Sequence, residues 1–159
     1  MLTALVADLR RIYEGNAWHG PSVLDALDGV TAEQAARRRL PGAHTIYELT
    51  HHIGAWMGEV ASRVQGNKPG MPPEGDFPAE STTVDAAAWE DVKARLARRQ
   101  AQLLEAVSNF DESRLDEPVD PKNRGVDGPV TYRALLSGLA QHSAYHAGQI
   151  VILKSSGKT

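Results

Sequence analysis

Four long stretches of this chain repeat apolar residues at the spacing of an α-helix, and this periodicity limits the fold more than any other feature. We expect helices over about residues 2–14, 45–65, 83–110 and 131–154, each with one apolar face. No stretch of useful length alternates between apolar and polar residues, so little or no β-strand is expected. Four such helices bury their apolar faces against one another. The predicted fold is an all-α, antiparallel four-helix bundle.

The connections between these helices differ in length and composition. Residues 15–44 form a long first crossover over one bundle end, with short helical stretches expected at 22–27 and 31–38. The second connection, NKPGMPPEGDFPAE, holds four prolines and two glycines, which predicts a loop at one end of the bundle. With 159 residues and 42% hydrophobic content the chain can form one core, and we expect residues 1–159 to be a single domain.

Composition and charge exclude several classes of function. The chain has no cysteine, so a metal site must use His, Asp or Glu. A net charge of -3 argues against nucleic acid as a partner. No stretch reaches the roughly 18 apolar residues of a membrane span, and the N-terminus has no apolar segment followed by a cleavage site. We therefore expect a soluble, cytoplasmic protein without nucleic-acid or membrane partners.

Three histidines are candidates for a metal site. His142 and His146 are one helical turn apart, about 6 Å along the axis, which places both imidazoles on one face. That pair alone also occurs by chance or as hydrogen-bonded core residues. The second long helix opens with a capping box at Thr45 and its periodicity turns His52 inward, whereas His51 is rotated by about 100°. His52 could supply a third ligand if the helix depths match.

Two segments carry a resemblance to a known family. HTIYELTHHIGAW (residues 44–56) and QHSAYHAGQIVILK (residues 141–154) resemble the signature helices of the DinB/YfiT superfamily, and the early NAWHGPSV is similar to a first-connector motif of one branch. The resemblance implies a four-helix bundle with a long first crossover. It also implies a three-histidine divalent metal site, whose ligands by motif position are His52, His142 and His146.

Three neutral nitrogen ligands leave a zinc or nickel ion with at least one open position, which is typical of a catalytic site. Zinc and nickel are the leading candidates, and copper and iron fit the same ligands. His19 is a candidate general base in the first connector, and His44 a candidate substrate contact; both could instead be ordinary connector residues. The polar residues expected to orient the rings are Tyr145, Gln149, Glu48 and Glu59. The tryptophans expected in the core are Trp18, Trp56 and Trp89.

Three functions are consistent with these features. Because relatives include thiol S-transferases and a mycothiol-dependent maleylpyruvate isomerase, the resemblance implies a metal-dependent transferase that uses a low-molecular-weight thiol and a small-molecule substrate. The alternatives are a metal-dependent hydrolase and a non-enzymatic, metal-binding stress-response protein. A homodimer is also expected. A metal that is open to solvent and has polar neighbours favours catalysis, whereas a site filled by Trp18 or the proline-rich loop favours the non-enzymatic function.

Overall fold

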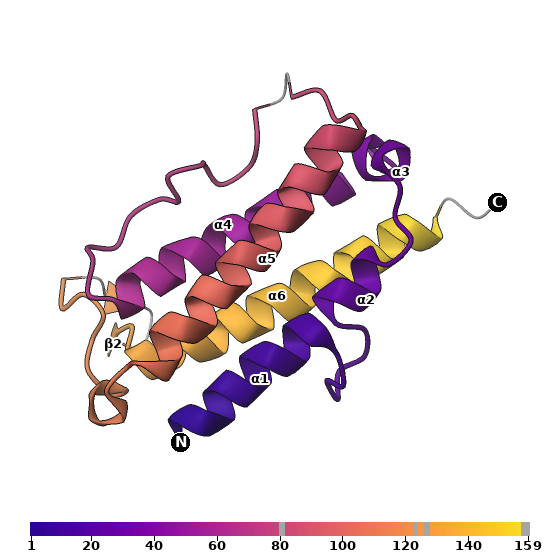
Figure 1. Cartoon of the computed structure of the whole chain (residues 1–159). Helices are drawn as coiled ribbons and strands as arrows, with labels where there is room; N and C mark the ends of the chain where they lie inside the picture. Colours follow the sequence, from indigo (N-terminus) through magenta and orange to yellow (C-terminus); the bar gives the residue numbers. More distant parts are fainter. Residues whose placement is uncertain (80–81, 123, 126–127, 157–159) are drawn as a thin grey trace.

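The computed structural model describes residues 1–79, 82–122, 124–125 and 128–156, and these residues are mainly helical (Figure 1). The predicted all-α fold is confirmed, and each predicted long helix agrees with an observed one to within three residues at either end. The helices are α1 (Leu2–Glu14), α2 (Val23–Leu27), α3 (Ala32–Ala36), α4 (Ile46–Val64), α5 (Ala86–Ser108) and α6 (Tyr132–Ser155), with a 3₁₀ turn at Glu112–Arg114. Strands β1 (Arg124–Gly125) and β2 (Gly128–Pro129) form a two-residue antiparallel pair.

Local chemistry explains where the helices begin. The side-chain oxygen of Thr45 accepts the backbone N–H of Glu48, and the Glu48 carboxylate accepts the backbone N–H of Thr45, as the predicted capping box requires. Residues with the same capping role precede α2, α3, α5 and α6: Ser22, Thr31, Asp85 and Thr131. Helix α1 begins after Met1 without a side-chain cap.

The four long helices form two pairs that run in opposite directions (Figure 1). In α4 and α5, Gly54 lies beside Leu96 and Gly58 beside Arg99, so these two helices run parallel. Helices α1 and α6 run the other way. Because α4 and α5 are parallel, the connection between them must return along the length of the bundle, and residues 70–76 lie beside α4 at Arg63, His51 and His52. The prediction that this proline-rich segment lies at one end of the bundle is therefore wrong.

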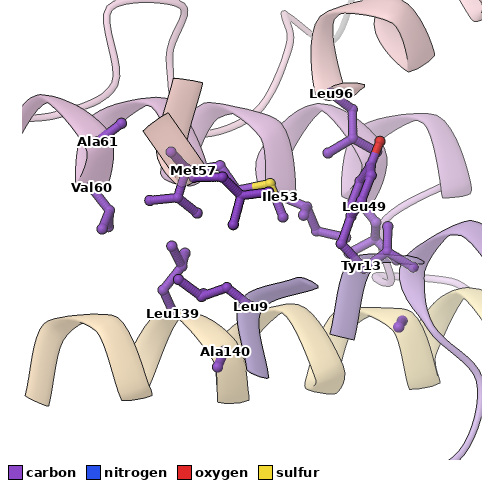
Figure 2. Close-up of a cluster of buried hydrophobic side chains, with 14 of the residues drawn as sticks. Leu9, Tyr13, Leu49, Ile53, Met57, Val60, Ala61, Leu96, Leu139 and Ala140 are labelled. Carbon is purple, nitrogen blue, oxygen red and sulfur yellow. The ribbon is translucent and has the colours of Figure 1, made fainter. Parts of the chain in front are cut away.

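The core lies where the apolar faces of the long helices meet. Figure 2 shows Ile53 and Met57 of α4, Leu139 of α6 and Leu9 of α1 in one buried cluster. Trp89 is buried as predicted, and its indole N–H donates to the Val30 carbonyl at 2.9 Å. The burial of these side chains supplies most of the driving force for the bundle.

The other two tryptophans do not lie in the core. Trp56 is half-buried, and Trp18 is fully exposed. The prediction for Trp18 is wrong because the turn at residues 17–20 projects from the surface of the bundle instead of folding into it. Among the described residues, no helix is both long and apolar enough to cross a membrane.

Glycine sets the distance between α4 and α5. A Cβ atom at Gly54 would lie 3.4 Å from the Cα atom of Leu96, so a larger side chain must push the helices apart. At Gly148, on the exposed surface of α6, an added Cβ atom would meet nothing within 4 Å.

We expect Gly54→Leu to lower the free energy of unfolding by about 1–3 kcal/mol, because it overpacks the α4–α5 contact. Equilibrium urea denaturation measures the change, and Gly148→Leu is the matched control, for which no loss is expected. Equal stability of the two variants would contradict the close approach of the helices.

Candidate metal centre

Three imidazole rings from two antiparallel helices converge in the middle of the bundle. His52 comes from α4, and His142 and His146 come from α6. The Nε2 atom of His142 is 2.8 Å from that of His52 and 3.1 Å from that of His146. Nitrogens that share a tetrahedral zinc ion at 2.0–2.1 Å are about 3.3 Å apart. The three predicted residues are thus brought together at a spacing that fits one divalent cation.

The nitrogen chemistry of this cluster also fits a cation. A neutral imidazole nitrogen carries either one proton or one lone pair, yet the His142 Nε2 atom faces two other Nε2 atoms. Ordinary hydrogen bonds cannot satisfy both contacts well, whereas three lone pairs can be directed at one cation. Three protein ligands would leave a tetrahedral ion one further position.

Asp76 holds the His52 ring from the side opposite to the cluster. The Nδ1 atom of His52 lies 2.9 Å from the Asp76 carboxylate and 3.1 Å from the Asp76 carbonyl oxygen. The Trp56 indole N–H donates to the same carboxylate at 2.7 Å. A carboxylate behind a ligating histidine fixes the ring and its tautomer, so that Nε2 keeps its lone pair for the cation.

Gln149 has the corresponding role for His146. Its amide oxygen lies 2.6 Å from the Nδ1 atom of His146, and its amide nitrogen donates to the Tyr145 hydroxyl at 3.1 Å. Of the residues predicted to orient the rings, Gln149 thus contacts a histidine of the cluster directly, and Tyr145 supports Gln149. Glu48 and Glu59 do not contact the three rings, since Glu48 caps α4 and Glu59 pairs with Arg63.

Sequence reasoning missed Asp76. It lies in the irregular segment between α4 and α5, 24 residues after His52, where no periodicity relates it to the histidines. An acidic residue among prolines and glycines is the only sequence signal, and that signal alone does not indicate contact with His52. Asp76 reaches the site because the segment returns along α4.

Residues 74–77, which we call the strap, are attached to α4 and α5 at several points. The Glu74 carboxylate accepts from Arg99 at 2.8 Å, and the Gly75 carbonyl oxygen lies 3.3 Å from His51 Nε2. The Phe77 ring stacks between His44 and His52, with centroid distances of 3.7 and 4.4 Å. The strap covers one side of the cluster. His51 faces the strap, in agreement with its predicted rotation away from the other histidines.

The first connector does not bring His19 to the cluster. His19 is exposed and lines a separate cleft with Trp18, next to Ser137 and Ala144 of α6. On a helix of 3.6 residues per turn, that face lies roughly opposite the one that carries His142. The catalytic role of His19 therefore gains no support from its position in the fold.

An open cleft of about 520 Å³ lies directly beside the cluster, between α4 and α6. His52 and His142 form one end of its lining, and most of its walls are apolar. The cluster is thus covered by the strap on one side and faces a cleft on another.

Burial favours the neutral form of two imidazoles of the cluster, those of His142 and His146. Removal from water, followed by the neighbouring His146 and His52, lowers the pKa of His142 to about 4. Burial also lowers the pKa of His146. Because metal ligation needs the deprotonated ring, the site is prepared to bind a cation at neutral pH.

The fold and this cluster define a helical bundle with a three-histidine centre on facing helices. A family model described as the DinB superfamily matches residues 17–150, and the chain belongs to this superfamily. The resemblance seen in the sequence is thereby confirmed. Comparisons with curated proteins and with solved structures gave no match.

We expect Asp76→Asn to weaken the binding of zinc by roughly 10- to 100-fold, because the amide no longer fixes His52 as a carboxylate does. Competition with a chromophoric chelator measures the affinity. Glu74→Gln is the control, since it alters the strap at Arg99 without touching a ring of the cluster. If both variants bind zinc as the unaltered protein does, Asp76 has no orienting role.

The metal-free protein should lose stability in acid. The pKa of His142 is about 4 in the folded protein and 6.5 as its ordinary value, so the unfolded chain binds more protons between these limits. The stability that follows from this pKa difference is fully present above pH 6.5 and is lost as the pH falls towards 4. Urea midpoints in chelator at several pH values should show this fall, with a shallower slope for His142→Gln. An equal slope in both proteins would contradict the assignment.

Proposed function

We propose that this protein is a metal-dependent enzyme that transfers a low-molecular-weight thiol to a small electrophilic substrate, with His52, His142 and His146 as ligands of zinc or nickel. The observation that carries the proposal is the convergence of three imidazole nitrogens beside an open cleft. Membership of the DinB superfamily supports a metal at this position. Cytoplasmic location and a homodimer are further parts of the proposal.

A bound divalent cation lowers the pKa of a thiol at its open position and so raises the fraction of nucleophilic thiolate. The protein's own residues orient the ligands and shield the site from water. Asp76 and Gln149 hold two of the rings in the ligating tautomer, and the strap excludes water from one side of the cluster. In the transfer, the sulfur forms a bond to the electrophilic carbon as the bond to the leaving group breaks. The leaving group departs with the electron pair of the broken bond, and the thiol proton passes to solvent.

The open cleft favours an enzyme over a purely metal-binding protein. Trp18 projects from the surface and does not fill the site, and the strap leaves the cleft beside His52 and His142 accessible. A site that served only to hold an ion would gain from being closed. Hydrolysis by an activated water, with His19 or a loop acid as proton acceptor, has less support. His19 lies on another face of α6, and the loop acid Asp76 is already held by His52 and Trp56.

The first test is the metal content of the untagged protein, measured by elemental analysis. We expect near-stoichiometric metal in the native chain, loss of most metal in His52→Ala and His142→Ala, and retention in His51→Ala. His51 is the matched control because it is equally buried on the same helix but faces the strap. Metal that is unaffected by His52→Ala or His142→Ala would overturn the proposed site.

A second measurement addresses the chemistry. The loaded protein should conjugate a thiol to a chromogenic electrophile such as 1-chloro-2,4-dinitrobenzene, and His142→Ala should lower the rate at least about tenfold, in line with the loss of a metal ligand. Metal binding without any thiol-dependent turnover across a panel of thiols and electrophiles would favour the non-enzymatic function.

A further inference from the structure

The cleft beside the histidines has an apolar character that the metal centre does not require. Its walls include Trp56 and Val60 from α4, and Leu135 and Leu139 from α6. It extends along α6 from His142 to Ala134, which is about 12 Å at the rise of an α-helix. An elongated apolar group that starts at the cluster would therefore have space along the helix.

The two charged side chains in the lining already have partners. Arg63 donates to the Glu59 carboxylate and to the Gly70 carbonyl oxygen, both at 2.9 Å, and its guanidinium lies over the Trp56 ring. Asp76 accepts from Trp56 and lies against His52. An anionic group on a ligand would meet an Arg63 whose positive charge the Glu59 carboxylate already balances. Within the described lining, the mostly apolar walls thus favour an uncharged occupant.

Gly138 keeps the middle of the cleft open. It lies on α6 between Leu135 and His142, and a Cβ atom built there would meet no atom within 4 Å. A helix with glycine at an exposed position is less stable than one with alanine. Glycine at this position leaves cleft space that any larger side chain would occupy.

We propose that this cleft binds an uncharged alkyl or aryl part of the thiol whose sulfur occupies the metal. The ligand class is a molecule with a single metal-binding group, such as a thiol, on an apolar body, without a second charged end. This inference rests on the proposed metal site, and it adds which class of ligand that site selects.

The test uses the Co(II)-loaded protein and three thiols: ethanethiol, butanethiol and hexanethiol. Binding is followed by the sulfur-to-cobalt charge-transfer absorption. Burial of each added methylene raises affinity by up to about fourfold, so we expect hexanethiol to bind at least about tenfold tighter than ethanethiol. A fourth probe, 6-mercaptohexanoate, should bind more weakly than hexanethiol because its carboxylate finds no free cation in the cleft.

Three glycine variants show whether the cleft causes the gain. Gly138→Leu should remove most of the advantage of hexanethiol over ethanethiol while cobalt is still bound, and Gly138→Ala should remove part of it. Gly148→Leu, at an open position of α6 outside the cleft, should keep the full advantage. Thermal melting confirms that all variants fold.

The outcomes separate this inference from the proposed function. Cobalt and ethanethiol binding without any dependence on chain length would overturn the cleft assignment and leave the metal site intact. Tighter binding of 6-mercaptohexanoate than of hexanethiol would overturn the requirement for an uncharged body. A protein that binds no cobalt, or whose cobalt spectrum does not respond to ethanethiol, would overturn the proposed function and this inference with it.

Discussion

The register between α4 and α6 is the constraint on which the rest of this structure depends. The two helices are antiparallel, and the apolar contacts around Ile53 and Leu139 set how far one is shifted along the other. At that shift, His52 faces His142 and His146 at the same depth. A slip of one turn, about 5.4 Å, would separate the nitrogens beyond the reach of one ion. The packing of the core therefore brings the three histidines together.

The parallel arrangement of α4 and α5 has a second consequence for the site. A connection between parallel helices must span the bundle, and here it passes over the face of α4 that carries His51 and His52. That path delivers Asp76 to His52 and Phe77 to the space between two histidines. The topology of the bundle thus supplies an orienting carboxylate that no residue of the long helices provides.

Burying imidazoles beside one another is costly if they are charged, and burial lowers the pKa of His142 and of His146, which favours the neutral form of both rings. The same neutrality makes the nitrogens available to a cation. The third ring differs from the other two, because His142 Nδ1 is buried and has no hydrogen-bond partner among the described residues, whereas His52 has Asp76 and His146 has Gln149. His142 is also the ring that borders the open cleft together with His52.

Local patterns in the sequence determined the long helices, their capping residues and the inward direction of His52, His142 and His146, because helical periodicity and capping depend on neighbours within a few residues. They did not determine the path of residues 65–79, the contact of Asp76 with His52 or the position of His19. Those features depend on helix directions and on contacts between residues distant in the chain. Only tertiary packing decided them, because only packing sets the register between helices and the side of the bundle that a connection follows.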